Sequence, residues 1–264
     1  MKITLFTANN PRHLRFAERL SEIAEQVYMV QECVTVFPGM IEDFYRKSDV
    51  MRSYFYRVIQ AERDIFGMPR FLPKKVRQLA IRTGDLSHAP LEMLSDALNS
   101  DIYVVFGASY IRPPLVDFLI DRMAINIHMG ISPYYRGSSC NFWALYDGHP
   151  DLVGATIHLL SRGLDSGSML YHVRPPAKPT DPFVFGMKAV DSAQRSLIKR
   201  ISSGEIYEFP AIQQEKSMEI RYTRNRDFTD EVAGRYLSRG ISADDIYKGI
   251  LFAPERNFLS LYQE

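Results

Sequence analysis

Hydrophobic and polar residues alternate along the first half of the chain in an order that predicts strands followed by helices. The runs expected to form strands are β-prone or largely apolar, and they are Lys2–Thr7, Val27–Val36, Val76–Arg82, Asp101–Phe106 and Ala124–His128. The segments expected to form helices lie between and after them, at about Leu14–Ile23, Glu42–Phe66, Ala89–Leu98, Pro113–Asp121 and Ser139–Asp147. Because strands that alternate with helices form parallel sheets with crossover helices, this order predicts a doubly wound α/β fold with a mostly parallel sheet.

The pattern changes after Gly154. Two further strands are expected at Gly154–Leu160 and Met169–Val173, separated by a tight turn over Gly163–Ser168. A proline-rich connector then leads into an amphipathic helix, after which the segments become short, mixed and polar. We therefore expect residues 1–204 to form the core and residues 205–264 to form a small C-terminal extension.

The composition is that of a globular protein, with 46% hydrophobic and 24% charged residues. The 32 Lys and Arg nearly balance the 31 Asp and Glu, so charge gives no reason to expect a nucleic-acid partner. No apolar stretch approaches the ~20 residues that span a bilayer, and the first residues do not resemble a signal peptide. Cys33 and Cys140 form no metal-ligand spacing with each other or with the histidines. We expect a soluble, cytoplasmic protein with free thiols and no metal.

Asn126 and His128 are the first candidates for chemistry. They lie two residues apart at the end of an expected strand, so their side chains should point to the same face. An imidazole beside a carboxamide can orient a carbonyl group, hold negative charge on its oxygen and exchange a proton. A buried histidine that is simply hydrogen-bonded to an asparagine is the alternative, and this pair alone favours it.

Asp165 is the second candidate, because it lies in a glycine-bracketed turn, Gly163-Leu164-Asp165-Ser166-Gly167, between two expected strands. Such a turn can present a carboxylate to a cleft and orient His128 or a water molecule. An ordinary turn aspartate that bonds to nearby backbone N–H groups is equally consistent with the spacing.

The loop after His128 offers a third group of polar side chains. Tyr134, Tyr135 and Arg136 stand between a proline and a glycine, and they are candidates to wall a substrate pocket. The proline and glycine would also be explained by a plain strand-to-helix connection.

Five segments together resemble the signature of the folate-dependent formyltransferases, a family that includes glycinamide-ribonucleotide, methionyl-tRNA and nucleotide-sugar N-formyltransferases. The matching segments keep the order of the family motifs, and they are Gly107–Pro113, Asn126–His128, Ser132–Gly137, Gly154–His158 and Gly163–Leu170. The first half of the chain, including the expected helix near Glu42–Phe66, matches the family weakly or not at all.

The resemblance implies a site and a mechanism. Asn126, His128 and Asp165 match the catalytic residues of the family, and no metal is required. The donor would be 10-formyltetrahydrofolate, held largely by backbone from two loops. The residues of these loops are Tyr110, Ile111 and Arg112 in one, and Leu160, Gly163 and Leu164 in the other. An amine would attack the formyl carbon while Asn126 and His128 stabilise the oxyanion, and Asp165 would orient the histidine and assist proton removal.

The choice of acceptor follows from the layout of the chain. Methionyl-tRNA formyltransferases carry a longer C-terminal domain, and glycinamide-ribonucleotide formyltransferases are generally shorter. The layout therefore favours a nucleotide-linked amino sugar, with residues 205–264 binding this acceptor or forming a homodimer face. The alternatives are another small amine of the glycinamide-ribonucleotide or hydroxyornithine type, hydrolysis of the formyl-folate by water, or a binding module without catalytic activity.

Overall fold

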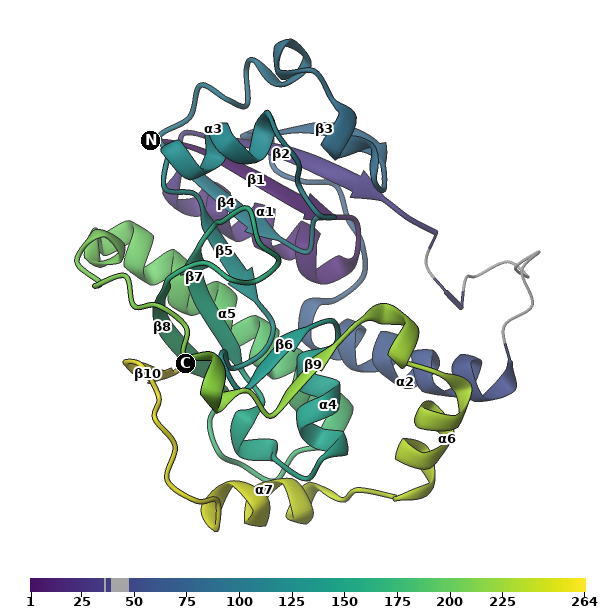
Figure 1. Ribbon diagram of the computed structural model, residues 1–264. Helices are drawn as coiled ribbons and strands as arrows, with labels where there is room; N and C mark the ends of the chain where they lie inside the picture. The colour runs from purple at the N-terminus through teal and green to yellow at the C-terminus, as the bar shows by residue number, and fades with distance from the viewer. Residues whose placement is uncertain (36, 39–47) are drawn as a thin grey trace.

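A central sheet covered by helices on both faces organises the computed structural model, which describes residues 1–35, 37–38 and 48–264 (Figure 1). The strands are β1 Lys2–Ala8, β2 Gln26–Cys33, β3 Val76–Arg82, β4 Ile102–Phe106, β5 Ile125–His128, β6 Tyr135–Gly137, β7 Ala155–Leu159, β8 Met169–Arg174, β9 Arg221–Thr223 and β10 Leu261–Gln263. The α-helices are α1 Pro11–Ile23, α2 Asp49–Phe66, α3 Leu115–Asp121, α4 Cys140–Tyr146, α5 Pro182–Ser203, α6 Asp230–Ser238 and α7 Ala243–Leu251.

In the described residues the main sheet has the strand order β10-β8-β7-β5-β4-β1-β2-β3. All adjacent pairs are parallel except those that β7 makes with β5 and β8. The predicted α/β fold with a mostly parallel sheet is therefore confirmed. β4 is buried along its whole length, as a strand covered on both faces must be.

The two faces of the sheet are covered by different helices. One face packs against α1 and α5 through residues such as Phe16, Leu20 and Leu197, and the other packs against α3 through Leu115 and Leu119. A further core cluster beyond the sheet joins α2, α4, α5, α6 and α7. This cluster forms one wall of the cavity described below.

Two of the predicted elements differ from the structure. Residues 89–98 do not form an α-helix: Leu91–Leu94 is a 3₁₀ turn, residues 95–98 form a further turn, and another 3₁₀ turn, Asp85–His88, precedes them. Pro90 explains the difference, because it lacks an N–H donor and keeps the preceding Ala89 extended at ψ 126°. The predicted helix over Glu42–Phe66 is found from Asp49 onward, where the Ser48 side chain caps the amide of Met51 at 3.1 Å. Its first part, residues 42–47, lies outside the described residues.

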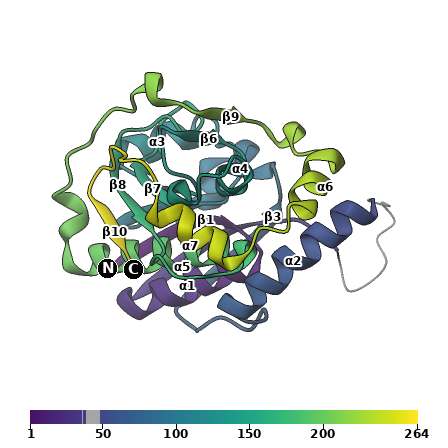
Figure 2. The same ribbon diagram turned by 90° about the horizontal axis from the view of Figure 1, so that it is seen from below.

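Residues 205–264 pack closely on the rest of the chain. β10 extends the main sheet beside β8, and β9 pairs with β6 in a separate small sheet. Figures 1 and 2 both place α6 beside α2, and Tyr54 of α2 meets Tyr236 of α6 in the shared core cluster. Among the described helices, none is long and apolar enough to cross a membrane.

Candidate active site

Asn126 and His128 lie on β5 next to the carboxyl end of β4, where the backbone leaves the sheet at Gly107. β7 runs antiparallel on the other side of β5 and places His158 opposite Asn126 in the register. The loop between β7 and β8 then carries Asp165 back toward His128. Asp165 adopts a left-handed φ of 47°, a conformation in which aspartate is enriched. Gly167 allows this loop to lie against β7, because a Cβ there would stand 1.7 Å from the Leu159 carbonyl oxygen.

His128 and Asp165 form a largely buried ion pair. Nδ1 of His128 lies 3.4 Å from Oδ1 of Asp165, and the two side chains are 5% and 16% exposed. Burial lowers the pKa of His128, but the Asp165 carboxylate and the Cys140 sulfur outweigh it and hold this pKa well above its usual value. Burial raises the pKa of Asp165, but the neighbouring His128 outweighs it and the net pKa is lowered. Both shifts favour the imidazolium–carboxylate form of the pair.

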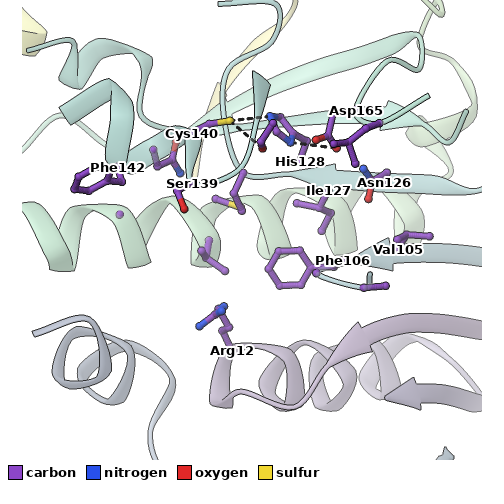
Figure 3. Close-up of a pocket in the computed structure, with 18 of the residues that line it drawn as sticks. Arg12, Val105, Phe106, Asn126, Ile127, His128, Ser139, Cys140, Phe142 and Asp165 are labelled. Atoms are coloured by element: carbon purple, nitrogen blue, oxygen red, sulfur yellow. Dashed lines mark hydrogen bonds and ion pairs between the residues drawn. The ribbon is translucent and has the colours of Figure 1, made fainter. Parts of the chain in front are cut away.

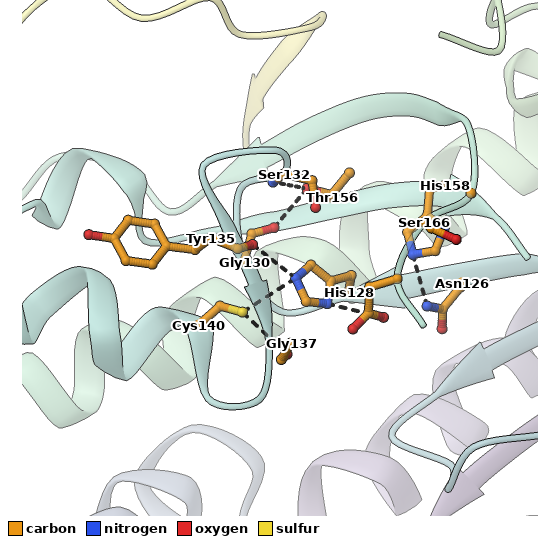
Figure 4. Close-up of polar contacts among 12 residues, drawn as sticks. Asn126, His128, Gly130, Ser132, Tyr135, Gly137, Cys140, Thr156, His158 and Ser166 are labelled. Carbon is orange, nitrogen blue, oxygen red and sulfur yellow. Dashed lines mark hydrogen bonds and ion pairs between the residues drawn. The ribbon is translucent and has the colours of Figure 1, made fainter. Parts of the chain in front are cut away.

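The second ring nitrogen of His128, Nε2, contacts two acceptor atoms. Nε2 lies 3.4 Å from the carbonyl oxygen of Tyr135 and 3.5 Å from Sγ of Cys140 (Figure 4). The thiol of Cys140 is itself directed to the Gly137 carbonyl at 3.3 Å, so its sulfur acts as the acceptor toward His128. The contact with Tyr135 is longer than an ordinary N–H···O hydrogen bond and sulfur is a weak acceptor, so this N–H keeps much of its capacity to donate.

Asn126 is oriented by His158. Nδ1 of His158 lies 2.8 Å from the carbonyl oxygen of Leu159, which can only accept, so Nδ1 carries the proton. Burial lowers the pKa of His158 to about 4, so the ring is neutral and Nε2 accepts a hydrogen bond from the Asn126 amide nitrogen at 2.9 Å. One amide N–H and the carbonyl oxygen of Asn126 remain for a ligand.

These side chains line a cavity of about 460 Å³ that reaches well beyond them. In Figure 3, Asn126 and Val105 lie on one side of His128, and Ser139 and Phe142 lie on the other. The end near Asn126 is bounded by residues 105–111 and by residues of the 158–165 segment, and the end near Phe142 is bounded by side chains of α2, α4, α5 and α6.

Most of the predicted site residues lie on this cavity. Those that line it are Asn126, His128, Asp165, Tyr110, Ile111, Leu160, Gly163 and Leu164. The structure does not bring Arg112, Tyr134, Tyr135 or Arg136 to the cavity wall. The Tyr134 hydroxyl accepts from the Asn257 amide at 2.9 Å, the Tyr135 hydroxyl donates to Asp147 at 3.0 Å, and Arg136 pairs with Glu219 at 3.1 Å. These three side chains stabilise the loop and its contact with residues 205–264.

The two loops predicted to hold a donor are fixed by side chains of other elements. The buried Glu32 carboxylate, at the end of β2, accepts from the amides of Ser109 and Gly84, each at 2.6 Å. The Tyr110 hydroxyl donates to the carbonyl oxygen of Arg162 at 2.7 Å and so joins the two loops. Gly107 adopts a φ of 72°, and a Cβ there would lie 2.6 Å from Nε2 of His13. Only glycine fits this position without displacing His13.

A family model described as "Formyl transferase" matches residues 68–200, half of the chain. The chain belongs to the formyl transferase family. A curated relative, the methionyl-tRNA formyltransferase of Synechococcus sp. (strain JA-3-3Ab), is 33% identical over 84 residues, which are 32% of this chain and 26% of that protein. The curated relatives are matched over about a quarter to a half of their own length.

Solved structures of formyltransferases share the fold over nearly the whole chain. A 4-N formyltransferase from Francisella tularensis has a TM-score of 0.51 at 16% identity and covers 100% of this chain and 98% of its own. An N-formyltransferase from Helicobacter canadensis, solved with folinic acid and dTDP-3-aminofucose, has a TM-score of 0.51 at 11% identity and covers 97% and 85%. At these identities the likeness establishes the fold.

Sequence reasoning missed two features near the site of this formyl transferase family member. His158 ends the matching segment Gly154–His158, but strand spacing gives it no role, because spacing does not reveal which residue of β7 faces Asn126. The aromatic side chains at the far end of the cavity were missed because α2 and α6 lie far apart in the sequence.

Among the described residues, no group of His, Cys, Asp or Glu could hold a metal ion.

Proposed function

We propose that this protein transfers a formyl group from 10-formyltetrahydrofolate to the primary amine of a nucleotide-linked amino sugar. The observation that carries the proposal is the His128–Asp165 ion pair beside Asn126 on the wall of a cavity large enough for two reactants. The shared fold with the Helicobacter canadensis enzyme, solved with a folate and a nucleotide-linked amino sugar, supports the same pairing of donor and acceptor here.

The end of the cavity near Asn126 suits a flat heterocyclic donor. Val105, Ile111, Val116 and Leu160 provide apolar surface there, and the backbone of residues 107–111 provides N–H and C=O groups at close range because Gly107 has no side chain. The donor would supply an activated formyl carbon. The loop ties through Glu32 and Tyr110 hold this end in shape before binding, which lowers the entropy lost on association.

The charges of the site match those that develop during transfer of an acyl group. Attack by an amine places negative charge on the formyl oxygen, and the free N–H of Asn126 and the imidazolium of His128 are positioned as donors to it. Because His158 fixes the direction of the Asn126 amide, that donor needs no reorganisation during the reaction. The carboxylate of Asp165 keeps His128 charged.

The proton and electron pair can be followed through the same residues. The amine lone pair forms the new N–C bond, and the electrons of the bond between the formyl carbon and the donor nitrogen return to that nitrogen. Asp165 accepts the proton that the amine loses, and His128 gives a proton to the departing nitrogen. Proton passage from Asp165 to His128 across their 3.4 Å contact then restores the starting pair.

Several features favour a small acceptor over a tRNA. The formal net charge is +1, whereas binding of a nucleic acid depends on many unpaired cations. In the basic segment near residue 221, Arg221 is held by two bonds to Asp147, at 2.7 and 2.8 Å, and stacks on Trp143. This arginine is engaged in stabilising the fold.

The proposal is tested by incubating the protein with formyl-folate and a panel of nucleotide-linked amino sugars, with mass spectrometry for the gain of a formyl group. Asn126→Ala, His128→Ala and Asp165→Asn should each lower turnover by about 100-fold or more while the far-UV spectrum is retained. Formate release without any amine would indicate a hydrolase instead. Near-normal turnover in all three variants would refute the site.

A further inference from the structure

The end of the cavity opposite the donor loops is walled by four aromatic side chains from four helices. They are Tyr54 of α2, Phe142 of α4, Phe183 of α5 and Tyr236 of α6. Ring centroids lie 5.6 Å apart for Tyr54 and Phe142, 4.9 Å for Phe142 and Tyr236, and 5.7 Å for Phe183 and Tyr236. Packing at these distances fixes the four rings as one rigid surface, defined here as the aromatic wall.

Two polar atoms of the aromatic wall have no partner. The hydroxyls of Tyr54 and Tyr236 make no hydrogen bond within the described part of the chain, although these residues are only 9% and 4% exposed. Both residues line the cavity, and neither hydroxyl oxygen is fully enclosed by protein atoms. By contrast, the buried hydroxyls of Tyr103 and Tyr135 donate to Leu98 and Asp147.

Burial raises the pKa of both Tyr54 and Tyr236. The two phenols are therefore neutral at physiological pH, and each can donate one hydrogen bond and accept another. Because buried polar groups are nearly always hydrogen-bonded in proteins, two open hydroxyls on an otherwise apolar wall indicate a ligand that supplies the missing partners.

The same end of the cavity lacks a free positive charge. Arg12 is the arginine among the described lining residues, and it is bonded to the buried Glu62 at 2.7 Å. The guanidinium of Arg57 lies 4.2 Å from the centroid of the Phe183 ring and is paired with Asp181 at 2.9 Å. A phosphate placed here would meet only cations that are already paired with carboxylates, which disfavours this end for the charged part of a nucleotide.

We propose that the aromatic wall is the subsite for an uncharged ring that carries hydroxyl groups and the reacting amine, with Tyr54 and Tyr236 as the residues that recognise those hydroxyls. Carbon-bound hydrogens of such a ring pack on the faces of Phe142 and Phe183, while the phenols exchange hydrogen bonds with its hydroxyls. This assignment rests on the proposed formyl transfer and adds the chemistry by which the acceptor is chosen.

The positions of the two tyrosines in the chain agree with a role in specificity. Asn126, His128 and Asp165 all fall within the family match over residues 68–200, whereas Tyr54 and Tyr236 lie before and after it. The reactive groups thus come from the shared core, and the hydroxyls that contact the acceptor come from segments outside that match.

The test uses the full chain with folinic acid bound and measures binding of ring amines by saturation-transfer NMR. The probes are the methyl glycoside of a 4-amino-4,6-dideoxyhexose and cyclohexylamine, a ring amine without hydroxyls. Tyr54→Phe with Tyr236→Phe should weaken binding of the glycoside by about tenfold, since two hydrogen bonds are lost. Binding of cyclohexylamine and of folinic acid should not change. Tyr207→Phe is the matched control, because Tyr207 is exposed and lies outside the cavity.

The outcomes separate this inference from the proposed function. A protein that fails to bind folinic acid contradicts formyl transfer itself. A protein that binds folinic acid but not the glycoside, or whose double variant binds the glycoside as tightly as the wild type, overturns the assignment of the aromatic wall. Equal weakening for the glycoside and cyclohexylamine would also overturn it, because it would reflect a change of shape and not lost hydroxyl contacts.

Discussion

The amide nitrogen of Asn126 donates to Nε2 of His158 at 2.9 Å, and the polarity of this bond is set by the carbonyl of Leu159 on the far side of the ring. A neutral histidine whose Nδ1 proton is already committed can only accept at Nε2. The carboxamide of Asn126 is thereby held in one of its two orientations. In the proposed mechanism His158 is a positioning residue that acts through Asn126.

His158→Phe should lower kcat by about tenfold, because the Asn126 amide loses the acceptor that orients it. The KM for the donor should change little, since the donor loops do not depend on this bond. His158→Gln, whose side chain also carries an acceptor, should restore part of the lost rate. Steady-state kinetics of both variants test this, and a pure KM effect would contradict the assigned role.

The two histidines of the site should differ in charge, although their ring centroids lie 6.4 Å apart. The pKa of His158 is lowered to about 4, whereas that of His128 is raised well above its usual value. At pH 6 to 7, His128 should be an imidazolium and His158 a neutral ring. Imidazole ¹⁵N shifts measured over this range test the difference, and it would be disproved if both rings titrated together near the ordinary value of ~6.5.

The ion pair between His128 and Asp165 predicts how the stability of the fold depends on pH. A raised pKa at His128 contributes stability that is fully present below ~6.5 and is lost as pH rises through the folded-state value. A lowered pKa at Asp165 contributes stability that is present above ~4 and is lost as pH falls through the folded-state value. The loss of unfolding free energy in Asp165→Asn should therefore be largest between about pH 4 and 6.5 and should shrink at alkaline pH. Urea unfolding of both proteins across this range measures it.

Cys140 should influence the protonation of His128, because its sulfur accepts from Nε2 at 3.5 Å. Cys140→Val removes this acceptor and should lower the pKa of His128, whereas Cys140→Ser retains an acceptor and should have the smaller effect. Cys33→Val changes the other free thiol, which lies outside the cavity, and serves as the control. Imidazole NMR titration measures the pKa of His128 in all three variants. Identical titration curves would show that Cys140 does not influence the protonation of His128.

Gly107→Ala should disturb the donor end of the cavity. The substitution combines a φ of 72° with a Cβ 2.6 Å from Nε2 of His13, so either the His13 ring or the backbone of residues 107–111 must shift. Gly240→Ala is a suitable control, because Gly240 has a φ of 57° but a Cβ added there would meet no atom within 4 Å. Both variants should lose about 1–2 kcal/mol of stability from the strained backbone. Folinic acid affinity, measured by calorimetry, should fall in Gly107→Ala alone.

The order of strands and helices was predictable because the period of the apolar pattern reports local structure directly. The placement of Asn126 and His128 on one face of their strand was also predictable, because side chains two residues apart along a strand point the same way. The meeting of Asp165 with His128 was not predictable from this rule, because it depends on a left-handed residue and on the reversed direction of β7. Spacing alone left that turn ambiguous, and the family resemblance supplied the expectation.

Other parts of the site depend on tertiary contacts that a single sequence does not report. Tyr135 and Arg136 were placed at a pocket because their loop follows His128, yet the loop turns these side chains toward Asp147 and Glu219. The aromatic wall joins residues 54 and 236, whose contact is decided by how α6 packs on α2. Local propensity gives no signal for either arrangement.

The residues proposed for formyl transfer and the tyrosines of the aromatic wall come from different parts of the chain, and this separation has an evolutionary consequence. Because Asn126, His128 and Asp165 lie on or beside the sheet, while Tyr54 and Tyr236 come from α2 and α6, substitutions in those two helices can reshape the aromatic wall without changing these three residues. Under the proposed function, a lineage with this layout could change its amine acceptor through substitutions in α2 and α6 while the residues proposed for formyl transfer stay the same.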